Sequence, residues 1–419
     1  MGGRMREFHI KDFGAVGDGV TLNTEAIQNT IDACARAGGG RVVIGEGKYM
    51  TGSITLRSGV DLHIESDGVL FGSDNCDDYP EKNNLNHVET QNLPRNRNAA
   101  LIFAEECENI SITGMGRIDC NGTSFVRKKD EWKGWEYERI EGLLTPPRVV
   151  FFTGCKNVRV EDVTMVNQPA GWSYWIHDCD YVTFDKCKIF AEVQYPNNDG
   201  IHINSSRNVT ISNCDITCGD DCIIVRANNR SLKENKICER VTVTNCNLTS
   251  YACGIRIAWI NDGTIRNCVF SNIVMTDTNT GICIKLPYKT EEQLALIPDR
   301  GREATLVENL SFTNIVMDGM YASPIRISLG KEPTMCRGVR NIYFDNVHSR
   351  GLSYPWFVGR EDNPIENVTM TNCSFIRVTD EELPDFRRHG AADWDRPIGK
   401  EMFTCVKNII LNNTSFTSY

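Results

Sequence analysis

The sequence predicts an all-β protein, a right-handed parallel β-helix (β-solenoid) with one capping helix near its N-terminus. Three observations support this fold class: a β-rich unit that recurs along the chain, the short spacing of its copies, and a single amphipathic helical segment. Each copy combines an Asn or acidic residue with an alternating β-rich run and a second short run. Clear copies begin at Glu108, Lys156, Asp180, Arg207 and Glu239.

The spacing of these copies favours a solenoid over other repeat architectures. Neighbouring copies from Lys156 to Glu239 begin about 24 to 32 residues apart, and repeats of roughly 20 to 50 residues indicate stacked units. A propeller blade would need about four strands and roughly 40 residues. One unit cannot bury its own apolar face, so the units must stack. Asn at the start of many copies suits a tight turn, because Asn tolerates the left-handed conformation and can bond along a ladder of turns.

The segment from Thr24 to Ala37 is expected to cap the N-terminal end of the solenoid, where an uncovered sheet edge would otherwise be exposed. A run of three glycines follows it, and its apolar positions have helical spacing: Ala26, Ile27, Ile31 and Cys34. No linker rich in Gly, Ser or Pro divides the chain. We therefore expect one domain over residues 1–419, with a cap region at about 12–51 and the main coils at 100–419.

Composition restricts the partners of this protein. A net charge of -10 and a pI near 5.4 argue against nucleic acid or an anionic membrane as the main partner. No apolar run approaches the ~20 residues of a membrane span, and the first residues show no apolar signal core. The 18 cysteines are scattered, and several lie in strand-like runs. They are expected to be buried thiols in a reducing, cytoplasmic compartment. The oligomeric state is left open.

Two long surface loops are expected, at about 73–98 and 127–147. The second contains Trp132, Trp135 and Tyr137. These aromatic side chains would either stack on a sugar ring or anchor the loop to the protein.

Five short runs place polar side chains on one face of the predicted solenoid. They begin at Asp199 (DGIHI), Asp220 (DDCIIV), Cys253 (CGIRIA), Thr280 (TGICIK) and Ser323 (SPIRIS). Aligned on their second apolar residue, they resemble equivalent strands of successive coils. Side chains alternate along a strand, so inward apolar residues would leave one outward column formed by His202, Ile224, Arg256, Cys283 and Arg326. Lys285 lies two residues beyond Cys283, on the same face.

Three carboxylates meet at the start of these runs. Asp199 and Asp221 begin their strands at equivalent places, with Asp220 beside them, so strand spacing should bring all three within roughly 5 Å. Such a cluster cannot ionise fully, and one acid should hold a proton near neutrality. Glycoside hydrolysis requires one protonated acid and one carboxylate. An acidic, turn-rich patch that binds Ca²⁺ is the alternative.

The chain resembles the polygalacturonase family, glycoside hydrolase family 28, over nearly its whole length. The opening DFGAVGDGVTLNTEAIQNTIDAC is similar to the family's N-terminal segment. Asn197-Asn198-Asp199 resembles its Asn-Thr-Asp, Gly219-Asp220-Asp221 matches its Gly-Asp-Asp, and Cys283-Ile284-Lys285 stands where it has Arg-Ile-Lys. The resemblance implies inversion of configuration, without a metal or organic cofactor. It further implies Asp220 as general acid, Asp199 and Asp221 as the pair that activates water, and Lys285 as a ligand of the sugar carboxylate.

Two positions depart from the family pattern. Its Gly-His-Gly reads Ala252-Cys253-Gly254 here, so the usual histidine is missing, and the usual arginine is Cys283. We hypothesise that Arg256, one coil earlier in the column, supplies the missing cation, with Arg326 further along. His202 would either tune the aspartates or face solvent in the groove. Cys253 and Cys283 are expected to fill space rather than act as nucleophiles, because no base accompanies either.

These features together predict an inverting glycoside hydrolase that acts on pectin-type oligosaccharides, either galacturonides or rhamnogalacturonan fragments, and is exo-acting. The predicted catalytic residues are Asp199, Asp220 and Asp221, and the predicted binders of a uronic-acid-containing substrate are Asn197, His202, Arg256, Lys285 and Arg326. Two alternatives remain: a polysaccharide lyase or epimerase on the same fold, and a non-catalytic carbohydrate-binding solenoid. A lyase product would absorb in the ultraviolet, whereas a hydrolase product would not.

Overall fold

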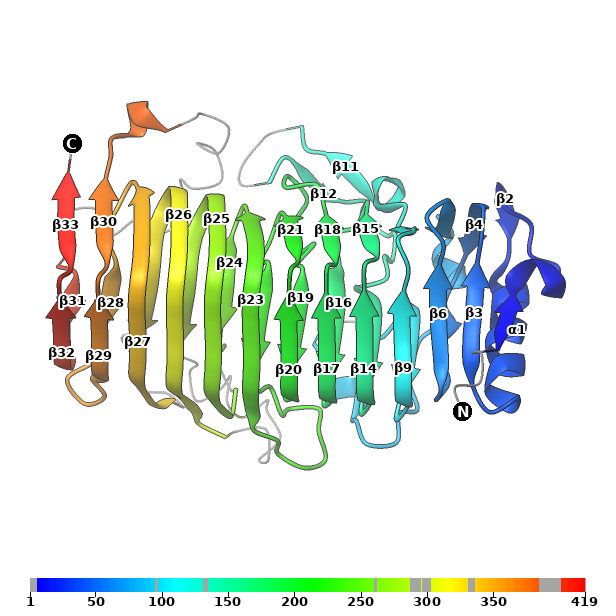
Figure 1. Cartoon of the computed structure of the whole chain (residues 1–419), viewed down its shortest axis with the longest axis horizontal. Helices are drawn as coiled ribbons and strands as arrows, with labels where there is room; N and C mark the ends of the chain where they lie inside the picture. The colour runs from blue at the N-terminus through cyan, green and yellow to red at the C-terminus, as the bar shows by residue number, and fades with distance from the viewer. Residues whose placement is uncertain are drawn as a thin grey trace.

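The chain forms one long parallel sheet that winds into successive coils. The computed structural model describes residues 6–94, 97–130, 135–259, 262–286, 295, 303–330, 336–383 and 401–418. Thirty-one strands pair into one sheet, and all their pairings along the coils are parallel. The coils stand side by side from the N-terminal to the C-terminal end, and helix α1 (Thr24–Arg36) lies at the N-terminal end (Figure 1). The structure matches the predicted parallel β-helix.

Each coil contributes a strand to three rows. The site row, which carries the predicted functional residues, contains β5 (Ile54–Thr55), β8 (Ala100–Glu105), β13 (Arg148–Thr153), β16 (Trp172–His177), β19 (Ile201–Asn204), β22 (Ile223–Arg226), β24 (Cys253–Ile257), β28 (Trp356–Val358) and β31 (Phe403–Thr404). The long row contains β1 (Glu7–His9), β3 (Gly40–Ile44), β6 (Val60–Ile64), β9 (Glu108–Thr113), β14 (Lys156–Glu161), β17 (Asp180–Asp185), β20 (Arg207–Ser212), β29 (Ile365–Thr371) and β32 (Val406–Asn412).

The short row completes each coil. It contains β2 (Asp18–Leu22), β4 (Gly47–Thr51), β7 (Gly68–Gly72), β10 (Arg117–Asp119), β15 (Thr164–Val166), β18 (Lys188–Phe190), β21 (Asp215–Cys218), β30 (Ser374–Arg377) and β33 (Ser415–Ser418). Four longer strands bend from one row into the next: β23 (Cys238–Ser250), β25 (Thr264–Leu286), β26 (Thr305–Leu329) and β27 (Cys336–Gly351). Short 3-10 turns lie at Ile10–Phe13, Cys76–Asp78, Thr90–Asn92, Gly122–Phe125 and Asp380–Glu382.

Asparagines hold the turns in register, as the sequence predicts. Asn157, Asn309 and Asn341 adopt left-handed backbone conformations, with φ of 54°, 57° and 58°. The side-chain amide of Asn341 donates to Oδ1 of Asn309 at 2.9 Å, and Asn367 donates to Asn341 at 2.8 Å. Each asparagine thus satisfies the turn of its own coil and bonds to the turn of the next.

The core follows the same column logic. Aromatic rings of Phe270, Phe312 and Phe344 stack from coil to coil at 4.9 and 5.1 Å between centroids. Helix α1 begins at the predicted residue and ends one residue early. It turns Ile27, Ile31 and Cys34 fully into the interior, so its apolar face covers the first coil, as a cap must.

The first long loop, around residues 73–98, folds over the N-terminal half of the site row. Val88 forms an antiparallel bridge with Leu232, and the backbone N–H of Glu89 donates to the carbonyl of Ser231 at 2.7 Å. Val88, Leu93 and Leu232 pack on a cluster of buried aromatic side chains from the site row: Phe103, Phe151, Trp172 and Trp175. The outward face of these strands is therefore buried before the predicted active site is reached.

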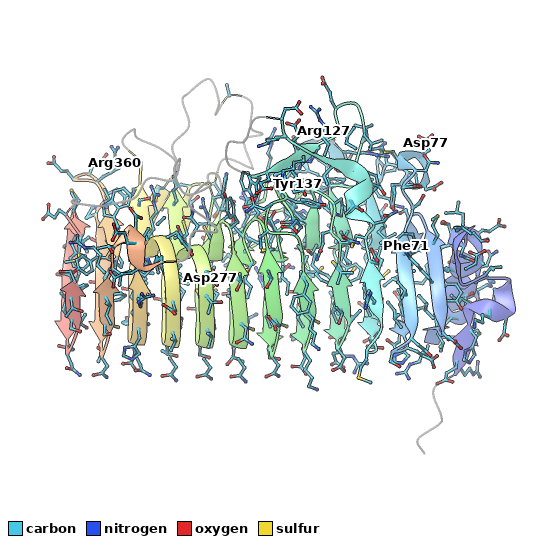
Figure 2. The ribbon with its side chains drawn as sticks, turned by 90° about the horizontal axis from the view of Figure 1, so that it is seen from above. Phe71, Asp77, Arg127, Tyr137, Asp277 and Arg360 are labelled. Atoms are coloured by element: carbon cyan, nitrogen blue, oxygen red, sulfur yellow. The ribbon has the colours of Figure 1, made fainter. Side chains whose placement is uncertain are left out.

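The second long loop carries a small hairpin of β11 (Val126–Lys128) and β12 (Tyr137–Arg139). Arg127 and Tyr137 lie together on one side of the row of strands (Figure 2). Tyr137 packs edge-on against Tyr195 at 4.8 Å, and the indole N–H of Trp135 donates to the carbonyl of Gly219 at 2.8 Å. Both side chains therefore anchor the loop, whereas Trp132 lies outside the described residues. Among the described residues, no helix combines the length and apolar character that a membrane crossing requires.

Candidate active site

The register of the site row confirms the predicted outward column. His202 pairs with Ile224, Ile224 with Arg256, Arg256 with Cys283, and Cys283 with Arg326. The column continues to aromatic residues at both ends, because Trp175 precedes His202 and Trp356 follows Arg326. Five consecutive positions inferred from local patterns thus occupy neighbouring coils.

The three predicted catalytic aspartates come together where β19 and β22 begin. One carboxylate oxygen from each of Asp199, Asp220 and Asp221 lies within 4.8 Å of the others. The pairing of Ile201 with Ile223 places Asp199 and Asp221 at equivalent positions of adjacent coils. Asp199 and Asp221 are buried, whereas Asp220 is partly exposed. Such a group of oxygens could also attract a divalent cation, and the sequence prediction of no metal stays a prediction.

Asp199 is held by the predicted histidine. Nε2 of His202 lies 2.8 Å from Oδ2 of Asp199, and both side chains are almost fully buried. The imidazole stacks on Trp172 at 4.3 Å, and Trp172 stacks on Trp175 at 4.6 Å. His202 is therefore not the solvent-facing groove residue that the sequence left open. It contacts an aspartate from a rigid aromatic support.

Asp220 is positioned by two N–H donors. The side-chain amide of Asn197 donates to Oδ2 at 2.9 Å, and the backbone N–H of Asp221 donates to Oδ1 at 3.1 Å. Asn197 has a φ of 56° and accepts a hydrogen bond from Nη2 of Arg139 at 3.1 Å. Arg139 also binds the carbonyl of Ala170 through Nε and Nη2. A relay from the β12 hairpin to Asp220 results, which sequence reasoning missed because Arg139 lies far from the motif.

The neighbouring turns are joined by Asn198, which stands where the family has Thr. Its Oδ1 accepts from the backbone N–H of Gly219 at 2.7 Å, and its amide donates to the carbonyl of Glu192 at 2.6 Å. The side chain is fully buried. The turn before Asp199 is therefore tied directly to the turn before Asp220.

Asp221 is a carboxyl group that favours its protonated form. Burial, with the charges of Asp220 and Asp199, raises the pKa of Asp221 to about 7, whereas Arg256 opposes the shift. Its Oδ1 accepts the backbone N–H of Cys253 at 3.1 Å. The expectation that one clustered acid holds a proton near neutrality therefore falls on Asp221.

The predicted cations differ in how far they reach the surface. Arg256 is 4% exposed; its guanidinium lies 4.2 Å from the ring centre of Trp259, and Nη2 donates to the carbonyl of Lys285 at 3.4 Å. Arg326 is similarly buried and lies 4.8 Å from the ring centre of Trp356. Lys285, by contrast, is exposed. Solvent and substrate therefore reach the side chain of Lys285 more easily than either guanidinium.

The two substituted positions form one thiol pair beside Arg256. Nη1 of Arg256 donates to Sγ of Cys283 at 3.3 Å. A hydrogen bond from Cys253 and the charges of Arg256 and Arg326 lower the pKa of Cys283 to about 6, against the effect of burial. Both thiols are buried, at 0% and 1% exposure. The prediction that they fill space agrees with this burial, but sequence reasoning missed the pairing of a cysteine with Arg256.

A parallel β-helix that gathers three carboxylates on its site row, flanked by cations, defines a candidate glycosidase. Residues 34–239 match the model of Glycosyl hydrolases family 28. This range contains the three aspartates and ends before Arg256.

Named relatives agree with this match. The chain is 27% identical to a "Probable polygalacturonase" of Vitis vinifera over 67% of its own length, which spans only 57% of that protein. It is 25% identical to an "Exopolygalacturonase" of Zea mays, over 83% of this chain and 86% of that protein. A solved exopolygalacturonase structure from Thermotoga maritima superimposes with a TM-score of 0.69, at 20% identity, over 98% of this chain and 93% of that chain. The chain is thus a distant relative of glycoside hydrolase family 28, the family that contains the polygalacturonases.

Proposed function

We propose that this glycosidase cleaves galacturonide-type or rhamnogalacturonan-derived oligosaccharides from one end, with inversion of configuration. The observation that carries hydrolysis is the cluster of Asp199, Asp220 and Asp221, in which one oxygen of each lies within 4.8 Å of the others. Inversion is inferred from the resemblance to family 28, because so short a separation would by itself suit a retaining enzyme. Hydrolysis needs one acid that protonates the leaving oxygen and one carboxylate that activates water. Relationship to a hydrolase family favours this chemistry over the lyase or epimerase alternative.

Separate surroundings support separate roles for the three aspartates. Asp220 is the most exposed of the three and is oriented by Asn197, which suits a group that reaches the glycosidic oxygen. Asp199 is held beside His202, and Asp221 lies opposite it across the strand pair. These two carboxylates would orient water between them. The pKa of Asp221 is raised to about 7, which places the proton of the resting cluster on this pair. The proposed roles therefore require that proton to lie on Asp220, with Asp221 ionised, when substrate is bound.

Lys285 supports an acidic substrate. Lys285 is exposed, so a substrate carboxylate can approach its side chain more easily than it can approach the buried Arg256 and Arg326. Arg256 and Arg326 add positive charge beneath this surface. A charge-assisted hydrogen bond from Lys285 would fix the carboxylate of one sugar unit.

The covered half of the site row supports action from one end. Val88, Leu93 and Leu232 bury the column at Phe103 and Phe151, on the N-terminal side of His202. A polysaccharide chain could not continue along the face in that direction. Relatives named exopolygalacturonases carry exo-action in their names. For this chain, the burial of the site row supports the proposal of the same mode.

We place this activity in a reducing compartment, where it would meet imported oligosaccharides. All 18 cysteines are free, and most are buried. A reducing environment would protect so many thiols from mispairing.

The test is a screen of purified protein on pectin-derived oligosaccharides, with reducing ends and ultraviolet absorbance read together. New reducing ends without unsaturated products are expected, and the first product should be a short sugar while viscosity of a polymer falls slowly. Asp220→Asn should abolish turnover, whereas Asp215→Asn, in a short-row strand, should leave it intact. Unchanged activity in Asp220→Asn would overturn the mechanism. Anomeric proton signals recorded early in the reaction would establish inversion or retention.

A further inference from the structure

We propose that the long row carries a second, non-catalytic binding surface for acidic oligosaccharides, centred on Tyr181. The first observation is a break in the asparagine ladder. Asn157, Tyr181, Asn208 and Arg240 occupy equivalent turns of successive coils, and all four have left-handed backbones, with φ of 54°, 59°, 57° and 56°. Asn fits that conformation, whereas a residue with a bulky ring rarely adopts it. An outlier of this kind is a reason to look for function.

The second observation is that Tyr181 stands in a hollow. A concavity of about 770 Å³ lies over β9, β14, β17, β20 and β23, which run side by side (Figure 1), and Tyr181 is among its lining residues. The tyrosine is 60% exposed. Its ring is therefore offered to solvent inside a depression, where the apolar face of a sugar ring can pack on an aromatic surface.

Charge and hydroxyl groups surround this ring. Arg159 and Arg240 line the hollow on either side of Tyr181, with side chains 48% and 55% exposed. Arg240 donates through Nε to Oδ1 of Asn208 at 2.7 Å. Each guanidinium also has one Nη1 contact with a protein carboxylate, Arg159 with Glu161 at 3.6 Å and Arg240 with Glu239 at 3.4 Å, so a ligand carboxylate would bind at the exposed remainder of each group. Thr183 and Thr210 pair between the two arginines.

These groups select one class of ligand. Two guanidinium groups can bind carboxylates in a planar, bidentate manner, threonine hydroxyls can bind sugar hydroxyls, and the exposed ring can stack. An oligosaccharide that contains uronic acids combines all three features. The protein's net charge of -10 argues against a nucleic acid as the ligand of this surface, because a nucleic acid carries a dense negative charge along its whole length. Because this ligand class is the proposed substrate class, the inference rests on the proposed function, and the surface would hold a longer chain near the catalytic face.

The test is calorimetric titration of the full chain, as the inactive Asp220→Asn variant, with oligogalacturonides of defined length. Two binding events are expected. Adding Tyr181→Asn should weaken one of them at least 10-fold, and Arg159→Gln should weaken the same event for acidic but not for carboxyl-reduced oligomers. Tyr181→Asn restores the ladder residue, so its melting temperature should equal or exceed that of the parent. Tyr343→Asn, at an exposed tyrosine of the same row outside the hollow, should change neither event.

A single binding event that Tyr181→Asn leaves unchanged would overturn the inference. Equal binding of acidic and carboxyl-reduced oligomers at the Tyr181 site would overturn it as well. Failure of the proposed function reads differently: wild-type protein would then release no reducing ends from any uronide, whereas the Tyr181-dependent binding event would still be present in the titration.

Discussion

The guanidinium of Arg256 lies 3.3 Å from the sulfur of Cys283, one coil further along the same outward column. Where the family places an arginine, this chain has a thiol whose pKa is lowered to about 6. The larger cause is the hydrogen bond with Cys253, and the charge of Arg256 adds to it. A thiolate beside a guanidinium cancels much of its charge. Arg256 therefore replaces the family cation in position, but its charge is less available to a substrate. Among the three predicted cations, Lys285 is the exposed one.

Removal of Lys285 should weaken acidic substrates selectively. Lys285→Ala is expected to raise KM for uronides by roughly 10-fold or more, because one charge-assisted hydrogen bond contributes about 1.5–3 kcal/mol. Arg256→Ala should also raise KM for uronides more than for neutral sugars. Steady-state kinetics on an acidic oligomer and its carboxyl-reduced form give the comparison. Lys188→Ala, in the short row, serves as the control, and equal effects on both substrates would reject carboxylate binding.

Asp221 should make stability depend on pH. Its pKa of about 7 in the folded protein lies above the ~3.9 of an unfolded aspartate, so its contribution to stability is present below pH ~4 and is lost as pH rises through 7. Asp221→Asn is therefore expected to raise the free energy of unfolding at pH 8 by up to a few kcal/mol, and with it the melting temperature. At pH 4 the substitution should change both little. Thermal unfolding at both values measures this. The control is Asp74→Asn, at an exposed aspartate, which should show no such dependence on pH. If Asp221→Asn stabilised the protein equally at both pH values, the prediction would be contradicted.

Arg139 should act on Asp220 through Asn197. Arg139→Met removes the donor to Oδ1 of Asn197, so the amide that orients Asp220 loses its support. We expect kcat to fall by about 10-fold with little change in KM, and Arg139→Lys to restore part of the loss. Arg127→Met, in the same hairpin but paired with Glu138, is the matched control. A fall in melting temperature that accounts for the lost activity would indicate a merely structural role.

Thiol reactivity should follow burial rather than number. Cys76, Cys336 and Cys405 are partly exposed, and the remaining cysteines are buried. A disulfide reagent added to native protein is expected to titrate at most three thiols quickly, with the rest reacting only on unfolding. Cys283 should remain protected despite its lowered pKa, because its sulfur is enclosed. Rapid modification of Cys283, located by peptide mass analysis, would show that the site opens in solution.

Much of this architecture could be predicted from local patterns. Strand alternation and turn chemistry operate over a few residues, so aligning DGIHI with CGIRIA was enough to place His202 and Arg256 in one column. The turn asparagines followed for the same reason. The approach of Asp199 to Asp221 needed only the assumption that successive coils stack in register.

Contacts between distant segments could not be predicted in this way. The stacking of His202 on Trp172 and the relay from Arg139 each join residues about 30 to 60 positions apart through loops whose paths no periodicity specifies. The burial of Arg256 and His202 has the same origin, since outward side chains become buried only once loops and neighbouring aromatic rings cover them. Alternation gives the direction of a side chain but not what lies above it.

The one-dimensional stacking of coils has a consequence for durability. Each coil contacts mainly its neighbours, so stability resembles a sum of coil and interface contributions, and opening should begin at the ends of the array. Strands β19, β22 and β24 stand well inside the array, with β5, β8, β13 and β16 before them and β25, β26, β28 and β31 after. Amide hydrogen exchange should be slowest in these central coils. Heat or denaturant would then fray the terminal coils first, while the carboxylate cluster keeps its geometry until the last cooperative step.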